Sequence, residues 1–364
     1  MLIRALLLIG FLGCAAHAQT GRENPFSIDV NYYYGTLMRH NANVANLVAN
    51  HPRGFLLNFN HKTYGEKRWQ REYNYPDLGF SFLYNNFQNP VLGENYGLYL
   101  HYNFYFLKRH LQLRIAEGVA YGTRPFDIET NFKNVAFGTK FLASSYLSIN
   151  YTTQNLFHGF GLQGGIIYVH HSNGSFKAPN SGTNTLAFNV GVQYHFDSPN
   201  VTYVGRENDQ PYSGPIAYNF VFRGGVNESD YLNLGQHPFY IFSVFADKRL
   251  TYKNTFQFGA EFLISKFLQK EIQYVAAAFP TTGITGNEDY KRVGVFVGHE
   301  FRIGKVAVPF HIGYYVYYPF RYESRFYNRG GFKYYFSEKI FAVGTVKSHG
   351  FNAEALEFGV GMRL

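Results

Sequence analysis

The sequence contains almost no cysteine, because Cys14 is the only one in 364 residues. It lies in a segment with the features of an export signal: a basic start at residues 1–4, an apolar stretch at 5–13 and a small-x-small pattern ending at Ala18. We expect residues 1–18 to be a cleaved signal peptide. The mature chain would then have no cysteine, and so neither a disulfide nor a thiolate metal site. Lipid modification of Cys14 is the alternative.

Long apolar runs and charged residues are also scarce. No stretch after residue 18 reaches the roughly 20 apolar residues that a transmembrane helix needs, which argues against a helical membrane protein. Charged residues make up only 16% of the chain, whereas aromatic residues reach 20% and glycines number 37. This composition, combined with alternating apolar residues, is typical of a transmembrane β-barrel. A secreted β-sandwich with shorter strands is the soluble alternative.

Acidic residues are fewer than basic ones, and the formal net charge is +9. A basic surface attracts polyanions. An exported protein does not routinely meet nucleic acid, so we expect no nucleic-acid partner and favour a phosphorylated anionic lipid. The alternative is that the charges only solvate the loops and the interior of a barrel.

Sixteen segments alternate as β-strands do, eight on each side of a polar stretch at residues 197–214. The first eight are 24–39, 54–64, 77–87, 96–106, 111–122, 145–154, 159–171 and 183–196. The second eight are 216–225, 239–252, 255–269, 291–304, 305–320, 326–336, 340–349 and 353–364. Trp69, the only tryptophan, lies in a charged segment that we expect to be an interfacial turn.

We predict an all-β fold, a transmembrane outer-membrane antiparallel β-barrel of about 14 to 16 strands, because most bacterial barrels close with an even number. Two eight-stranded barrels are the alternative. Residues 19–197 would form the first half and residues 198–364 the second. An even strand number leaves both chain ends on the periplasmic side. The loop between His170 and Asn184 would then emerge at the outer surface.

The stretch 168–196 carries the chemistry. His170 and Ser172 lie two residues apart in a predicted strand, so their side chains point to the same face. An imidazole beside a hydroxyl is the arrangement that activates a serine as a nucleophile. After a polar loop, alternate residues from Leu186 onward are apolar, and Asn184 is in phase with them. A Ser–His pair beside a lipid-facing surface suggests an esterase whose substrate is the membrane itself.

The spacing of this stretch matches a known pattern: it reads HHSNG at residues 170–174, KAPNSG at 177–182 and then Thr183-Asn184. It resembles the lipid A 3-O-deacylase (PagL-type) family, which comprises acyloxyacyl hydrolase-like β-barrel esterases of the outer membrane. That family has His-x-Ser-Asn, then Lys-x-Pro-Asn-x-Gly, then an acid two residues after the glycine. The resemblance covers residues 19–197.

The resemblance implies a serine esterase that hydrolyses the 3-O-acyl ester of lipid A without a cofactor. Its partner would be lipopolysaccharide in the outer leaflet of a Gram-negative outer membrane. Ser172 would be the nucleophile and His170 the general base. By position, the site residues are catalytic Ser172, His170 and Asn184, oxyanion and support residues Asn173, Gly174 and Asn180, and Lys177 as a phosphate contact. The alternative for Lys177 is that it only caps a loop.

One position departs from the family pattern, because Asn184 stands where the acid is expected. An asparagine oxygen holds an imidazole tautomer but does not neutralise an imidazolium. Losing the carboxylate of a triad can cost about 10⁴ in turnover, although Cys-His-Asn enzymes work. Glu207 and Asp209 lie beyond the far end of the eighth strand, so we expect them to be poor substitutes. His171 should face the barrel interior.

The resemblance assigns no role to residues 198–364. A porin or transporter barrel with a degenerate motif is therefore the alternative function. We expect no metal site, because His158, His299 and His311 are scattered without the spacing of metal ligands.

Overall fold

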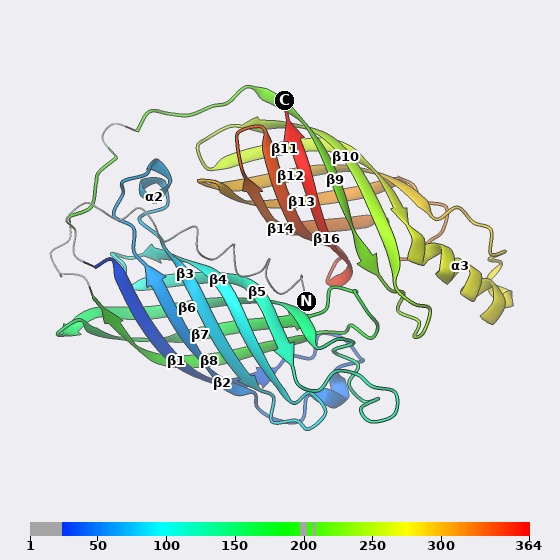
Figure 1. Cartoon of the computed structure of the whole chain (residues 1–364), viewed down its shortest axis with the longest axis horizontal. Coiled ribbons are helices and arrows are strands. Elements are labelled where there is room, and N and C mark those ends of the chain that lie inside the picture. The colour runs from blue at the N-terminus through cyan, green and yellow to red at the C-terminus, as the bar shows by residue number, and fades with distance from the viewer. Residues whose placement is uncertain (1–23, 197–201, 207–208) are drawn as a thin grey trace, which may run out of the picture.

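The computed structural model describes residues 24–196, 202–206 and 209–364, so the predicted signal peptide and Cys14 lie outside the described part. Within that part, sixteen strands form two separate closed barrels, each of eight antiparallel strands. The barrels lie next to each other, joined by the segment between β8 and β9 (Figure 1). The all-β antiparallel barrel class predicted from the sequence is confirmed.

Each barrel is a series of consecutive hairpins that closes on its own first strand. The strands of the first barrel are β1 (Phe26–Leu37), β2 (Arg53–His61), β3 (Asp77–Asn86), β4 (Glu94–Phe106), β5 (Leu111–Gly122), β6 (Phe141–Phe157), β7 (Phe160–Ser172) and β8 (Thr183–His195). The strands of the second are β9 (Ile216–Asn227), β10 (His237–Arg249), β11 (Asn254–Ser265), β12 (Lys291–Ile303), β13 (Val306–Tyr317), β14 (Phe326–Tyr335), β15 (Ile340–His349) and β16 (Asn352–Arg363). The connections contain η1 (Ala45–Leu47), α2 (Arg68–Glu72), α3 (Lys266–Ala278) and η2 (Pro280–Thr282).

The closure differs from our first expectation. A single barrel of about 14 to 16 strands is wrong, and the alternative of two eight-stranded barrels is confirmed. The reason is that β8 pairs back onto β1, with Val192 opposite Val30. This closure removes the free edge of β8, so β9 has no edge to pair with and must start a new barrel.

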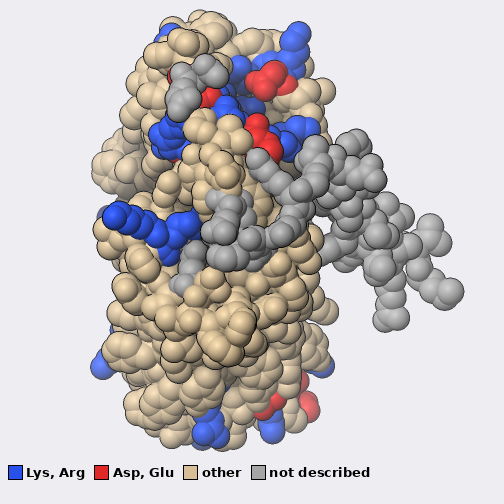
Figure 2. Space-filling model, turned by 90° about the vertical axis from the view of Figure 1, so that its left-hand side faces the viewer, with Lys and Arg blue, Asp and Glu red and all other residues tan. Residues whose placement is uncertain are grey.

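The outward faces of both barrels are apolar. Along β8, Leu186, Phe188 and Val190 are exposed, whereas the alternate residues Thr185 and Asn189 are buried. This alternation is the one that a barrel surrounded by lipid requires. On the face that Figure 2 shows, Lys, Arg, Asp and Glu gather near the top and the bottom of the view and in one group at middle left, and wide areas between these groups are free of them.

Paired charges and large side chains fill the barrel interiors. In the first barrel, Nη2 of Arg114 lies 2.7 Å from Oδ2 of Asp29. In the second, Arg329 bridges Glu261 and Glu357, with 2.7 Å to each. All five side chains are almost completely buried. An eight-stranded barrel is only wide enough for its own side chains, so these groups pack the interior rather than line an open channel.

Two connecting segments differ from the sequence prediction. The strand expected at 255–269 ends at Ser265, where α3 begins and buries Phe267 and Ile272 on one face. Trp69, expected in a turn, lies in α2 between β2 and β3. No helix in the described part of the chain is long and apolar enough to cross a membrane.

Candidate active site

His170 and Asn184 face each other across the β7–β8 pair. Nδ1 of His170 lies 2.6 Å from Oδ1 of Asn184. An amide oxygen only accepts, so the imidazole donates from Nδ1 and keeps the lone pair of Nε2 free. This is the tautomer in which a histidine can take a proton from a serine. Both side chains are half-buried, in phase with the exposed residues of their strands.

Ser172 lies on the same outward face as His170, at the end of β7. It pairs with Ala143 of β6, which also belongs to the outward-facing set of its strand. Despite this orientation, the residue is only 8% exposed. The loop at residues 173–182 accounts for this, because its last residue folds back over the serine.

Gly182 is the residue that approaches both groups. A Cβ added to it would lie 3.3 Å from Cβ of Ser172 and 3.5 Å from Cε1 of His170. Among the described residues, no hydrogen bond joins the Ser172 hydroxyl to the His170 imidazole. Both side chains therefore lie close to Gly182 without a hydrogen bond between them in this conformation.

Gly182→Ala is expected to slow, about tenfold, the ester hydrolysis that the sequence predicts for this site. The residue has a φ of +66°, and the new Cβ would lie 3.0 Å from the carbonyl oxygen of His171. The loop would have to move away from Ser172, in addition to a backbone cost of about 1–2 kcal/mol. The measurement is the rate of ester hydrolysis by the purified full chain.

Gly283→Ala is the matched control for this substitution. Gly283 also has a positive φ, +74°, but nothing lies within 4 Å of an added Cβ. It should carry the same backbone strain with unchanged hydrolysis. Equal losses in the two variants would show that strain alone, rather than crowding of Ser172, lowers the activity.

His171 points into the interior of the first barrel, as the sequence predicted. It is fully buried, and its Nδ1 lies 2.7 Å from Oγ of Ser144. The imidazole also packs edge-on against Phe87 and Phe137. His171 therefore supports the wall behind the site and takes no direct part in it.

Hydrogen bonds within the loop 173–182 engage the candidate oxyanion residues. The backbone N–H of Asn173 donates to Oδ1 of Asn180 at 2.7 Å, and its side-chain amide donates to the carbonyl oxygen of Lys177 at 2.6 Å. The Lys177 side chain itself is exposed. Asn180 thus shapes the loop, and the donors of Asn173 have loop acceptors in this conformation.

Neighbouring loops of the first barrel brace the same segment. The N–H groups of Ser181 and Gly182 donate to the carbonyl oxygens of Val135 and Ala136, both at 3.1 Å. Nε2 of His40 lies 2.8 Å from the carbonyl oxygen of Ser181. Sequence reasoning missed these contacts, because main-chain oxygens leave no trace in a residue pattern.

The sequence offered two acidic residues, Glu207 and Asp209, as substitutes for the missing carboxylate. Glu207 lies outside the described residues. Asp209 pairs with Arg71 near α2, with 2.7 Å between Oδ1 and Nη2, and this hydrogen bond holds the pKa of Asp209 below its ordinary value. The segment with α2 joins β2 to β3, at the barrel end opposite the 173–182 loop. Asp209 therefore lies away from the candidate site, as the sequence predicted.

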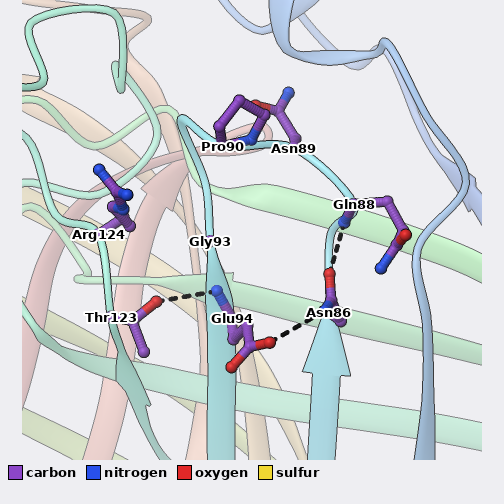
Figure 3. A pocket seen from close by; sticks show the side chains of 8 residues that line it. All are labelled: Asn86, Gln88, Asn89, Pro90, Gly93, Glu94, Thr123 and Arg124. Atoms are coloured by element: carbon purple, nitrogen blue, oxygen red, sulfur yellow. Dashed lines mark hydrogen bonds between the residues drawn. The ribbon is translucent and has the colours of Figure 1, made fainter.

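A separate cavity of about 400 Å³ lies on the rim between the β3–β4 connection and the end of β5 (Figure 3). Within it, Glu94 accepts a hydrogen bond from the Asn86 side chain at 2.9 Å, and its backbone N–H donates to Thr123. None of the predicted catalytic residues lines this cavity. In residues 24–196, 202–206 and 209–364, no group of three or more His, Cys, Asp or Glu could hold a metal ion.

Comparisons with known proteins cover most of the chain. Residues 53–193 match the family model described as lipid A 3-O-deacylase (PagL), and residues 216–364 match the one described as acyloxyacyl hydrolase, C-terminal domain. No curated protein matches.

Among solved structures, a double mutant of Rh. blastica porin is 10% identical, covering 93% of this chain and 99% of its own, with a TM-score of 0.21. A triple mutant of Rhodopseudomonas blastica porin is likewise 10% identical, covering 93% of this chain and 100% of its own, with a TM-score of 0.19. These TM-scores are too low for the likeness to carry an argument.

Proposed function

The chain belongs to the lipid A 3-O-deacylase (PagL) family, and from this premise we propose that it is an outer-membrane serine esterase that hydrolyses the 3-O-acyl ester of lipid A. The family supports lipid A deacylation as the activity and lipid A in the membrane as the substrate. One observation above all supports the residue roles: Nδ1 of His170 lies 2.6 Å from Oδ1 of Asn184. His170 itself precedes Ser172 by two residues on the same face of β7.

In the proposed reaction, Nε2 of His170 takes the proton of Ser172 Oγ as this oxygen attacks the acyl carbonyl. The intermediate collapses, the bond between the acyl carbon and the sugar oxygen breaks, and His170 returns the proton to that oxygen. Water, activated by the same imidazole, then releases the fatty acid from Ser172. The chemistry requires Oγ within about 3 Å of Nε2, a contact that often tightens only when substrate binds.

Two further roles belong to the proposal. Asn173 would donate to the oxyanion once the substrate replaces its present acceptors, Asn180 Oδ1 and Lys177 O. The exposed ammonium of Lys177 would meet a phosphate of lipid A, to which it adds a point charge. Leu186 and Phe188, exposed on β8 beyond Asn184, lie where an acyl chain would approach along the barrel wall.

The test is to express the full chain in the outer membrane of a Gram-negative host and to follow lipid A by mass spectrometry. The expected result is the loss of one acyl chain, with fragment ions that place the new free hydroxyl at the 3-position. An unchanged lipid A in cells that contain the folded barrel would overturn the proposal. Loss of an acyl chain from another position of lipid A would support deacylase activity but refute the assignment to the 3-O position.

Pore formation, the alternative from the sequence, gains no support from barrel interiors filled by pairs such as Arg114 and Asp29. Planar-bilayer recordings of the purified chain should show no steady conductance.

A further inference from the structure

The loop that carries the site motif also contacts the second barrel. Oγ of Ser175 donates to the carbonyl oxygen of Ala353 at 2.5 Å. The side chain of Gln236 donates to the carbonyl oxygen of Phe176 at 2.7 Å. A Cβ added to Gly174 would lie 3.0 Å from Cβ of Leu356. The start of β16 and the connection between β9 and β10 thus lie against this loop (Figure 1).

Glu228 makes the most complete of these contacts. Its Oε2 accepts the N–H of Ala178 at 3.0 Å, and its own backbone N–H donates to the carbonyl oxygen of Ser175, also at 3.0 Å. Its other oxygen accepts the N–H of Gly235 at 3.0 Å, which ties the carboxylate to its own connection. The residue is only 7% exposed, so water competes little for these bonds.

The contacts of Glu228 fall at both ends of the turn that shapes the site. Ser175 follows directly after the Asn173–Gly174 pair, and Ala178 precedes Pro179 and Asn180. Asn180 in turn holds the N–H of Asn173, next to Ser172. A shift of Ala178 would therefore be transmitted through Asn180 to the backbone beside the nucleophile. Misplacement of a catalytic group by about 1 Å can cost about 10²-fold in rate.

We propose that the second barrel positions the catalytic loop of the first, and that Glu228 is its principal positioning residue. This inference rests on the proposed function and gives residues 198–364 a role in it. Glu228 touches neither the substrate nor the reacting atoms in this scheme. It fixes the loop that begins with Asn173, directly after Ser172.

The test uses the full chain in detergent micelles and compares Glu228→Ala with Glu228→Gln. Two rates are measured: lipid A hydrolysis, and labelling of Ser172 by an alkyl fluorophosphonate, which reports the reactivity of the serine without lipid A. Glu228→Ala should lower both kcat and the labelling rate about tenfold with little change in KM. Glu228→Gln keeps one acceptor oxygen for Ala178 and should lose less than about threefold.

Glu288→Ala is the matched control. This carboxylate accepts backbone N–H groups of Thr285 and Gly286 at 2.7 and 3.0 Å, within its own connection of the second barrel. Its loss should leave both rates unchanged. If Glu228→Ala does not fold, Ser175→Gly takes its place. It removes the bond to Ala353 in the second barrel, together with the longer bond of 3.4 Å that the hydroxyl accepts from Asn180, and it suits the positive φ of +59°. It should slow labelling several-fold.

The outcomes separate the two proposals. Wild-type rates in Glu228→Ala and Ser175→Gly, in a chain that deacylates lipid A, would overturn the positioning role alone. Equal losses in Glu228→Ala and Glu288→Ala would also overturn it, since a general weakening of the second barrel would then explain both. A wild-type chain that neither labels at Ser172 nor deacylates lipid A would overturn the proposed function, and the positioning role with it.

Discussion

Ser172→Ala is expected to lower lipid A deacylation by at least about 10⁴-fold, because loss of the nucleophile from a Ser–His enzyme removes nearly all turnover. Of the two serines of β6 beside this end of β7, Ser144 is turned inward to His171 at 2.7 Å. Ser145 pairs with His170 and belongs to the outward-facing set of its strand, so it is the hydroxyl that any residual activity would point to. The measurement is the rate of fatty-acid release from lipid A by the purified protein, with mass spectrometry of both products. The barrels should remain folded, because the substitution removes one oxygen at the end of β7.

Ser181→Ala is the control for that experiment. Ser181 lies in the same loop, its main chain is held by Val135 and His40, and its hydroxyl has no hydrogen-bond partner among the described residues. Wild-type rates are expected. If Ser172→Ala kept more than about one hundredth of the activity, the nucleophile would have to be sought elsewhere.

The strands were predictable and the closure of the barrels was not. The segments 111–122 and 340–349 were predicted with the bounds that β5 and β15 have, because alternation along a strand directly reports its two faces. Alternation does not report the partner of a strand edge. Whether β8 pairs with β1 or with β9 is decided by the curvature of eight connected strands, which no single residue encodes.

The same distinction applies to the site. The contact between His170 and Asn184 was predictable, because both residues belong to one hairpin and the outward phase of Asn184 follows from Leu186 and Phe188. The contact between Ala178 and Glu228 was not, because the residues are 50 positions apart and lie in different barrels. Gly182 was recognisable as a turn former, but its approach to Ser172 became visible only when the loop was folded.

Asn184 is the position at which one substitution should lower the activity and another should raise it. Asn184→Leu removes the acceptor 2.6 Å from His170 Nδ1, so the proton is free to occupy Nε2, and we expect about 10³-fold slower deacylation, as for other catalytic histidines held in the wrong tautomer. Asn184→Asp restores a carboxylate at the same distance. It should speed deacylation about tenfold, because charge-assisted hydrogen bonds are roughly twice as strong as neutral ones.

Comparing Asn184→Leu with Asn184→Asp shows whether Asn184 acts on His170 by orienting it, and whether a charge at this position adds to the rate. The rates are measured on lipid A in micelles, and Ser172 labelling by the fluorophosphonate should follow the same order. Loss in Asn184→Leu with gain in Asn184→Asp would mean that orientation and charge both contribute and that the natural chain uses only the first. If Asn184→Asp were instead slower than wild type, the free energy lost by desolvating the half-buried carboxylate would exceed the free energy gained by stabilising the imidazolium. Wild-type rates in Asn184→Leu would remove Asn184 from the machinery and leave His170 oriented by the packing of β7 alone.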